Sequence, residues 1–452
     1  MKREADDIKL MTEGSIWKTI LLFSIPLILG NLLQQLYSTV DSIIVGNIVG
    51  PGALAAVGAS TSIVNLLIAF SQGASVGAGV IIAQYLGAGD HKGLEKSVHT
   101  ALAIALILGT ALSIGGLVTT KAILVWMNTP SDVLADSVSY LRIYSCGLIF
   151  NVIYNMNAGI LNATGNSRRS LIYLCYASVT NIVLDLVFIA CLKAGVAGAA
   201  AATDISQAVS CVLSFIFLSR TKSEYRVTLR KIALDRKMAV RIVKIGLPTA
   251  VQNTVISFSN VLVQSSVNAF GSAAMAGFGA YMKIDGFNIL PVTSFSLSVT
   301  TFTGQNFGAG RIDRVKKGMF TTLLMSTFYT AFTGLLLLLF STSVMRLFTS
   351  DPSVIAYGSR TLHYFCSCYY LLGMMYILAG TVRGTGKSIP PMLILIFSMC
   401  IFRIIYLKLI APIFGTYDAV MMMYPASWIT GLILMSLYTW KGKWLSLPSD
   451  HS

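Results

Sequence analysis

Charged residues are scarce in this sequence. Asp, Glu, Lys and Arg make up 11% of its 452 residues, whereas an ordinary soluble domain has about 25%. Apolar residues make up 55%, and the mean hydropathy is +0.73. So few charges cannot cover the surface of a soluble protein of this size. This excludes a cytosolic enzyme and a disordered protein, and it indicates a polytopic membrane protein.

Histidine and cysteine are also few, with four and seven residues. No two histidines form a ligand pair, and Cys366-x-Cys368 lacks the spacing of a metal or redox motif. We therefore expect no cofactor, and a membrane-embedded enzyme is disfavoured because it would need a nucleophile–base or metal constellation. Gly384–Ser388 resembles the end of a phosphate-binding loop, but the first required glycine is Thr381. The small residues of Gly73–Gly77 are typical of close helix packing.

Long apolar segments dominate the chain. A membrane-spanning helix needs about 20 mostly apolar residues, and the backbone of such a segment must be satisfied internally. The sequence therefore predicts an all-α polytopic membrane protein with twelve transmembrane helices. They are expected at 16–45, 53–83, 97–120, 133–160, 170–192, 196–219, 242–269, 273–304, 318–341, 353–381, 389–411 and 418–440.

Lys and Arg are distributed unevenly between the connections. Of the 33, 25 belong to the two ends and to alternate connections, and only 4 to the other connections. Because cytoplasmic segments carry the excess of basic residues, both termini are expected in the cytoplasm. This distribution explains the net charge of +15 without a nucleic-acid partner, and it makes the lipid bilayer the expected surrounding.

The two halves of the chain repeat one another. Three blocks recur at one constant spacing in sequence, here called the repeat offset: Gln84–Asp90 as Gln305–Arg311, Gly58-Ala59 as Gly279-Ala280, and Ala163–Asn166 as Gly384–Lys387. We predict an N-terminal six-helix lobe (1–219), a basic cytoplasmic linker (220–241) and a C-terminal six-helix lobe (242–452), related by a pseudo-two-fold axis along the membrane normal. Transporters built this way move substrate by alternating access, so the prediction is a secondary transporter and not an enzyme.

Four of the 18 acids lie well within spans, where each costs free energy unless it has a role. They are Asp41, Asp185, Asp204 and Asp285. Asp41 shares a polar helix face with Gln34, so it could bind Na+ or a proton, or make a structural hydrogen bond. Asn181 and Asp185 are four residues apart and share one helix face. A carboxylate and an amide oxygen suit a hard cation such as Na+.

Other polar residues in the spans have more open interpretations. Thr203 could add a hydroxyl oxygen to a cation site, whereas its neighbour Asp204 could equally be a packing or water-cavity residue, since the two point about 100° apart. Asp285 is as readily structural as functional. We expect Arg403 to snorkel to the membrane surface or to form an ion pair.

These features together resemble the multidrug and toxic compound extrusion (MATE) transporters of prokaryotes, and in particular the DinF-like branch. The resemblance rests on a set of features spread over nearly the whole chain: Pro26, Gln34 and Asp41 in the first span, the duplicated blocks, Asn181 with Asp185, Gly198–Thr203, and twelve spans in two sets of six.

The resemblance implies an antiporter of the prokaryotic inner (plasma) membrane that exports organic cations or amphipathic drugs in exchange for Na+ or H+, and we expect it to act as a monomer. It assigns cation coupling, with a possible Na+ site, to Asp41, Asn181, Asp185 and Thr203. The NorM-like branch also uses acids in spans 7 and 10, which this sequence does not have.

The substrate cavity of the resembling transporters is expected between the lobes. Its candidate residues are Gln34, Asn155, Asp204 and Asp285. The alternative function is a lipid-linked oligosaccharide or lipid flippase of the same general fold. That class is expected to show more cationic residues in its cavity, whereas the charges in the first six spans are mostly acidic. A channel would need rings of polar groups across most helices, and the sequence does not show them.

Overall fold

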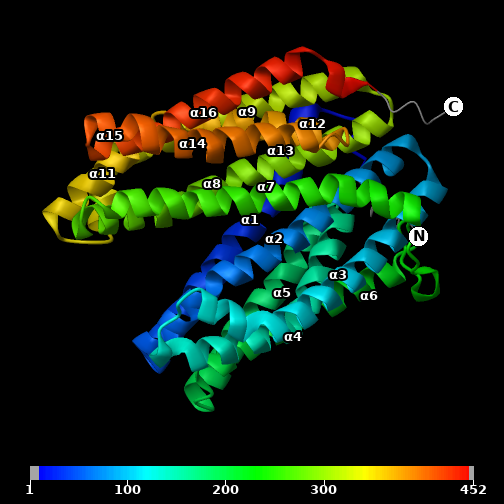
Figure 1. The fold of residues 1–452 in the computed structure, drawn as a ribbon. Helices are drawn as coiled ribbons and strands as arrows, with labels where there is room; N and C mark the ends of the chain where they lie inside the picture. Colours follow the sequence, from blue (N-terminus) through cyan, green and yellow to red (C-terminus); the bar gives the residue numbers. More distant parts are fainter. Residues whose placement is uncertain (1–9, 447–452) are drawn as a thin grey trace. The chain divides into compact units, whose positions relative to one another are not determined.

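The computed structural model describes residues 10–446, which are helical almost throughout and contain no β-strand (Figure 1). The helices are α1 (Ile16–Ile44), α2 (Pro51–Ala88), α3 (His91–Trp126), α4 (Ser131–Ala163), α5 (Ser167–Asp185), α6 (Gly195–Arg220), α7 (Arg236–Asn268), α8 (Ser272–Gly308), α9 (Ile312–Leu339), α10 (Ser341–Arg346), α11 (Pro352–Cys366), α12 (Tyr369–Gly384), α13 (Ile389–Ile396), α14 (Phe402–Ile405), α15 (Ala411–Phe414) and α16 (Tyr417–Trp440). Short π-helical turns join some of these into longer rods: Val45–Val49 after α1, Leu186–Cys191 after α5, and Phe397–Ile401 and Tyr406–Ile410 between α13 and α15.

The helices account for all twelve predicted spans. Within residues 10–446, nine helices are long and apolar enough to cross a membrane, and α11 with α12 makes a tenth when counted as one bent span. The two remaining spans are α7 and α8, which have 33 and 37 residues but are less apolar. The all-α, twelve-helix prediction is therefore confirmed. The basic residues Lys2, Arg3 and Lys9 lie outside the described residues.

The chain divides into two compact units, and the division does not follow chain order. The first unit contains residues 25–250, and the second contains Met11–Ser24 together with residues 251–446. The first part of α1 thus packs in the second unit, and the first part of α7 packs in the first unit. The linker was predicted at 220–241. The last six residues of this range are helical in the structure, because α7 begins at Arg236.

In the first unit, α4 lies at the centre and contacts α2, α3 and α6. The close packing expected of Gly73 and Gly77 is present, on α2. A Cβ at Gly77 would lie 2.4 Å from the Ile242 carbonyl oxygen, and one at Gly73 would lie 2.7 Å from the Gly246 carbonyl oxygen. The backbones of α2 and α7 therefore touch where these glycines leave room.

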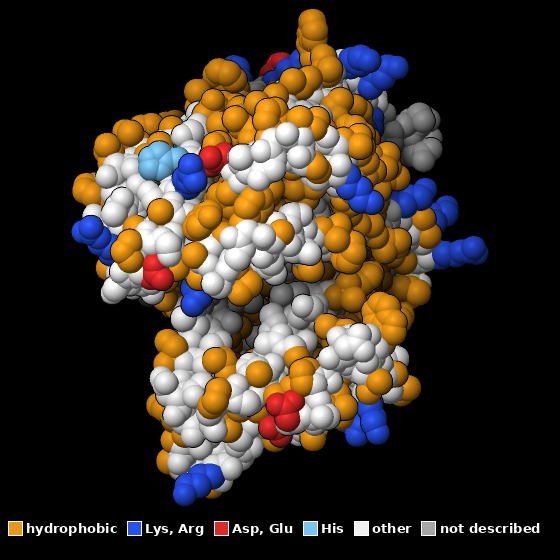
Figure 2. Space-filling model, turned by 60° about the vertical axis from the view of Figure 1, so that its left-hand side comes forward, with side chains coloured by type: hydrophobic (Ala, Val, Ile, Leu, Met, Phe, Trp, Pro, Cys, Tyr) orange, Lys and Arg blue, Asp and Glu red, His pale blue; other side chains and the backbone are white. Residues whose placement is uncertain are grey.

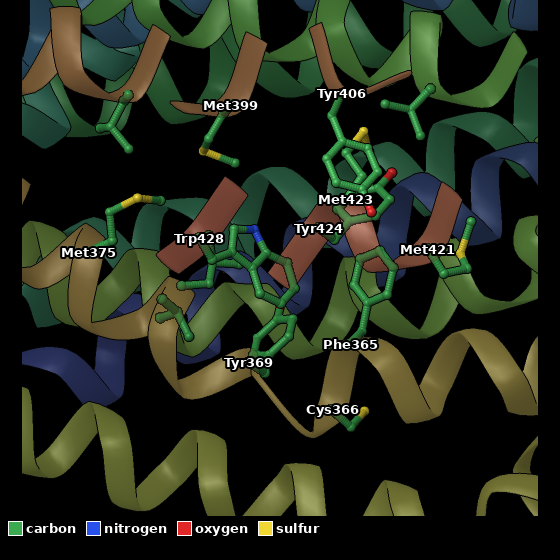
Figure 3. Packing of buried hydrophobic residues seen from close by; sticks show 14 of the residues in the cluster. Phe365, Cys366, Tyr369, Met375, Met399, Tyr406, Met421, Met423, Tyr424 and Trp428 are labelled. Carbon is green, nitrogen blue, oxygen red and sulfur yellow. The ribbon is translucent and has the colours of Figure 1, made fainter. Parts of the chain in front are cut away.

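In the second unit, α8 contacts α9, α11 and α12, and α12 contacts α16. Aromatic and methionine side chains fill the core between these helices (Figure 3). The tenth span was predicted as one helix, but it is bent by 47° between α11 and α12. At this break Phe365 and Tyr369 both pack edge-on against Trp428, at centroid distances of 5.4 and 5.9 Å. Both rings thus pack on one indole at the point where the helix is interrupted. The residues at the break include no proline or glycine from which the bend could be predicted.

The internal repeat is visible in single hydrogen bonds. The hydroxyl of Ser75 donates to the carbonyl of Asn155 at 2.6 Å, and the hydroxyl of Ser296 donates to the carbonyl of Tyr376 at 2.9 Å. Ser296 follows Ser75, and Tyr376 follows Asn155, by the repeat offset. The repeat found in sequence is therefore also a repeat of tertiary contacts.

The duplicated Gln-x-x-Gly-Ala-Gly block helps to hold the segment before α1. The Gln305 side chain accepts a hydrogen bond from the Met11 N–H at 2.7 Å, and the Asn306 amide donates to the Met11 carbonyl at 3.2 Å. Arg314 donates to the Gly14 carbonyl at 3.1 Å. The block thus anchors a segment that precedes it by almost 300 residues.

The segment before α7 is held on α3 in the corresponding manner. The Thr228 N–H donates to Nε2 of His99 at 3.0 Å, and the Asp235 N–H donates to the Thr100 hydroxyl at 3.4 Å. Lys231 pairs with the carboxylate of Glu95. In both units, the connection that leads into the first helix of one repeat is fastened to the other repeat.

The outer faces of the helices are apolar. Hydrophobic and uncharged side chains predominate on the face drawn in Figure 2, and charged side chains on it are few and scattered. Val118 on α3 and Phe328 on α9 are 76% and 75% exposed. Such surfaces suit contact with lipid chains, in agreement with a multi-pass membrane protein.

Candidate functional site

Two carboxylates meet inside the first unit. Asp41 lies near the end of α1 and is half-buried, whereas Asp185 is the last residue of α5 and is fully buried. The two side chains interact with each other. Apart from this mutual interaction, Oδ1 of Asp41 and both oxygens of Asp185 have no hydrogen-bond partner among the described residues. An acidic pair in this state needs a cation or proton to balance it, because like charges repel strongly where water is excluded.

Asn181 lies one turn before Asp185 and is 1% exposed. Neither atom of its amide group has a partner within residues 10–446. A buried polar group without a partner is costly, so this amide is available to a ligand. The i, i+4 spacing on α5 thus places an amide and a carboxylate on one face, as the sequence predicts.

Thr203 and Asp204 follow each other on α6, and both are half-buried. The Thr203 hydroxyl donates to the Ala199 carbonyl at 3.1 Å, and in the described structure it makes no hydrogen bond to Asp41 or Asp185. The position of Asp204 depends on a glycine in α4. A Cβ at Gly147 would lie 2.0 Å from Cγ of Asp204, so only glycine leaves room for this carboxylate.

Tyr140 on α4 lies within electrostatic range of the three acids. It is 7% exposed and interacts electrostatically with Asp41, Asp185 and Asp204. Its ring stacks on Tyr144, with centroids 6.3 Å apart. Sequence reasoning missed Tyr140, because a tyrosine in an apolar span has the same pattern as a core residue.

Gln34 and Asn155 lie at different distances from this cluster. Gln34 is two turns before Asp41 on α1 and interacts with Tyr37, which also interacts with Asp41. Asn155 lies fifteen residues beyond Tyr140 on α4, which is about 22 Å along the helix. Its amide donates to Asn151, at 2.9 Å. The structure therefore brings Gln34 towards the acids, but not Asn155.

Asp285 belongs to a separate group in the second unit. It accepts a hydrogen bond from the Tyr281 hydroxyl at 3.1 Å, and it interacts with Tyr369 and Arg403. The expectation for Arg403 is wrong. Its side chain does not snorkel, since it is 1% exposed, and no ion pair joins it to an acid among residues 10–446.

The first-unit cluster offers oxygen atoms and no basic partner. No Lys or Arg of the described chain contributes to the electrostatics of Asp41 or Asp185. Within the same residues, no three His, Cys, Asp or Glu side chains converge as metal ligands. A bound Na+ would therefore use the Asp41–Asp185 pair together with neutral oxygens such as that of Asn181, and a proton would need only the pair.

Comparison with known proteins agrees with this architecture. The MatE family model matches the chain twice, over residues 26–187 and 248–407. The chain belongs to the MatE family. The two matches fall on the two copies of the internal repeat, and each ends before the last helix of its copy.

Relatives of this MatE protein include proteins named for multidrug resistance. The probable multidrug resistance protein YpnP of Bacillus subtilis is 28% identical over 396 residues, covering 87% of this chain and 88% of the relative. YoeA of the same organism, also a probable multidrug resistance protein, is 29% identical over 86% and 85%. An outward-facing structure of a multidrug resistance MATE family transporter superposes with a TM-score of 0.88 at 24% identity, covering 96% of this chain and 97% of that one. This structural similarity shows that the two proteins share a fold.

Proposed function

We propose that this MatE protein is a secondary active antiporter that exports cationic or amphipathic organic compounds in exchange for Na+ or H+, by alternating access. The observation that carries the proposal is the Asp41–Asp185 pair, buried without a basic partner and with unpartnered carboxylate oxygens. Such a pair is stable only with a cation or a proton. The multidrug resistance names of the relatives support the class of substrate.

The coupling step follows from where the pair lies. Asp41 is on α1, which runs through both compact units, and Asp185 is on α5 in the first unit. Cation binding removes the repulsion between the two carboxylates and allows α1 to pack more closely on α5. Cation release restores the repulsion. Ion occupancy thereby biases the position of α1, which is the differential interaction that any ligand-driven change requires.

The lipid flippase alternative has less support. A pyrophosphate headgroup needs cationic partners, whereas the charged cluster of the first unit consists of Asp41, Asp185 and Asp204. These acids suit a cationic ligand and would repel a phosphate.

The test is ethidium efflux from vesicles that contain the purified full chain. A Na+ gradient and a pH gradient are imposed separately on wild type, Asp41→Asn and Asp185→Asn. We expect one gradient to drive efflux and both variants to abolish it. Asp136→Asn is the matched control, because Asp136 is exposed on α4 outside the cluster. Wild-type efflux in both cluster variants would refute the coupling role, and no efflux from wild type under either gradient would favour the flippase.

Tyr140→Phe refines the test. The variant keeps the ring that stacks on Tyr144 and removes the hydroxyl, which interacts electrostatically with the three acids. We expect the ion concentration for half-maximal efflux to rise while the maximal rate is retained, since the carboxylates remain. An unchanged ion dependence would show that the hydroxyl has no part in the site.

A further inference from the structure

The second unit has a counterpart of the cation site, and its position follows from the repeat. On α6, the Ser206 hydroxyl donates to the Thr203 carbonyl at 2.7 Å. On α16, further along the chain by the repeat offset, the Ser427 hydroxyl donates to the Tyr424 carbonyl at 2.8 Å. Both residues of the second bond follow those of the first by the repeat offset, so we pair Tyr424 with Thr203.

Arg403 stands where the first unit has Asn181. The blocks Ala163–Asn166 and Gly384–Lys387 align at the repeat offset just before the two helices concerned. The π-helical turn Phe397–Ile401 then accommodates one additional residue in the second copy. From this turn to Leu407, within the same rod, the spacing between equivalent positions is therefore one residue longer than the repeat offset, which pairs Asn181 with Arg403. On α16 the pairs again follow the repeat offset.

The two acids have no acidic counterparts. The prolines inside α1 and α7, Pro26 and Pro248, are also separated by one residue more than the repeat offset. The position of Asp41 therefore corresponds to Val263, which is fully buried. The position of Asp185 corresponds to Leu407. The second copy has thus exchanged two carboxylates for apolar side chains and an amide for a guanidinium.

Neutral groups surround that guanidinium. Nε of Arg403 donates to the Ser427 hydroxyl at 3.2 Å, and Nη1 donates to the Asn260 side-chain oxygen at 3.2 Å. The guanidinium carbon lies 4.6 Å from the ring centroid of Tyr424. Figure 3 shows Tyr424 on the helix that also carries Trp428, within the aromatic core of this unit.

The nearest acid balances the charge only at longer range. Asp285 interacts electrostatically with Arg403, but no ion pair within 4 Å joins them in the described structure, and Asp285 is hydrogen-bonded to the Tyr281 hydroxyl instead. An aromatic face and neutral oxygens are what a protein uses to hold a cation that is not directly paired. The groups that line this pocket are therefore of the kind that bind a cation.

We propose that Arg403 is a tethered cation that permanently fills the second unit's counterpart of the cation site. The coupling cation then exchanges only in the first unit. This inference rests on the proposed function for the meaning of the first site, but the pocket itself is defined by Asn260, Tyr424 and Ser427. A second consequence follows directly: when the side chain is shortened, the vacated pocket binds a free guanidinium ion.

The experiment is chemical rescue of the purified full chain in detergent. The thermal unfolding midpoint of Arg403→Ala is measured in millimolar guanidinium or methylguanidinium chloride, with urea as the neutral isostere and NaCl at equal ionic strength. We expect the substitution to lower the midpoint, and guanidinium to restore at least half of the loss in a saturable manner, because a ligand that binds the folded state stabilises it. Urea and NaCl should restore none.

Arg360→Ala is the control for a general effect of guanidinium. Arg360 lies in the same unit, but its side chain is 58% exposed and paired with Asp418 at 3.2 Å. No rescue of Arg403→Ala, equal rescue by urea, or equal rescue of Arg360→Ala would overturn the proposal. The readout is stability at rest, so it is independent of whether efflux is ion-driven.

A second pair of variants covers poor folding of Arg403→Ala. Arg403→Lys keeps a cation within reach of Asn260 and Ser427, whereas Arg403→Met fills a similar volume without charge. We expect Arg403→Lys to keep most of the wild-type thermal stability and Arg403→Met to lose it. Equal or greater stability of Arg403→Met would show that the pocket does not require a cation, and the proposal would fall.

Discussion

Gly77→Ala tests the backbone contact between α2 and the first part of α7. The new Cβ would lie 2.4 Å from the Ile242 carbonyl oxygen and 2.7 Å from the Gly246 nitrogen. Ordinary contact begins at 3.4 Å, so the helices must separate by 3.4 − 2.4 = 1.0 Å. Both contacts are backbone atoms, and neither can rotate away.

The expected size of the effect follows from two opposing contributions. Forcing a methyl group into a packed contact costs about 1–3 kcal/mol. Replacing glycine by alanine inside a helix stabilises it by about 1 kcal/mol. We therefore expect Gly77→Ala to be destabilised by up to about 2 kcal/mol, seen as a lower unfolding midpoint in detergent.

Gly79→Ala is the matched control for Gly77→Ala. Gly79 lies two residues further along α2, where a Cβ would meet only the Gly159 carbonyl oxygen at an ordinary 3.6 Å. This variant keeps the helix-propensity gain without the clash, so its midpoint should equal or exceed that of wild type. If Gly77→Ala is as stable as Gly79→Ala, the proposed contact between α2 and α7 is not tight in solution.

Two further predictions concern the site and the anchored segment. Gly147→Ala should displace Asp204, whose Cγ would lie 2.0 Å from the new Cβ, and should reduce ethidium efflux at least tenfold. Gly115→Ala is the control, because a Cβ there meets nothing within 4 Å, and it should transport normally. Equal efflux by the two variants would remove Asp204 from the mechanism. Arg314→Ala should lose the hydrogen bonds to the backbone before α1 and speed amide hydrogen exchange in that segment several-fold. Lys317→Ala is the control, because its side chain is exposed on the same helix. Unchanged exchange in Arg314→Ala would mean that Gln305 and Asn306 are sufficient to hold the segment.

The twelve spans could be predicted from sequence because each needs a long apolar run, and that requirement is local. The repeat could be found because the blocks around Gln84 and Gln305 kept their residues. The bend between α11 and α12 could not be predicted, since it depends on how Phe365 and Tyr369 meet Trp428. The first part of α1 packs in the second unit and the first part of α7 packs in the first unit. This also depends on tertiary contacts, which composition does not encode.

The candidate site was partly predictable for the same reason. Asp41 and Asp185 are conspicuous as acids in apolar spans, and Asn181 is tied to Asp185 by helix spacing. Tyr140 was missed because its role arises from three acids on other helices. The surroundings of Arg403 were mistaken because neutral partners such as Asn260 carry no charge pattern that sequence can reveal.

The anchoring of the segment before α1 has a consequence for biosynthesis. Its partner Gln305 is 294 residues further along the chain than Met11. At about 5–20 residues per second, a ribosome needs about 15–60 s to make that interval. The end of α1 that follows this segment therefore lacks its final contacts until the second half of the eighth span has been made. Docking of this segment is therefore a late step relative to its own synthesis, although α9 to α16 are still to be made when Gln305 emerges.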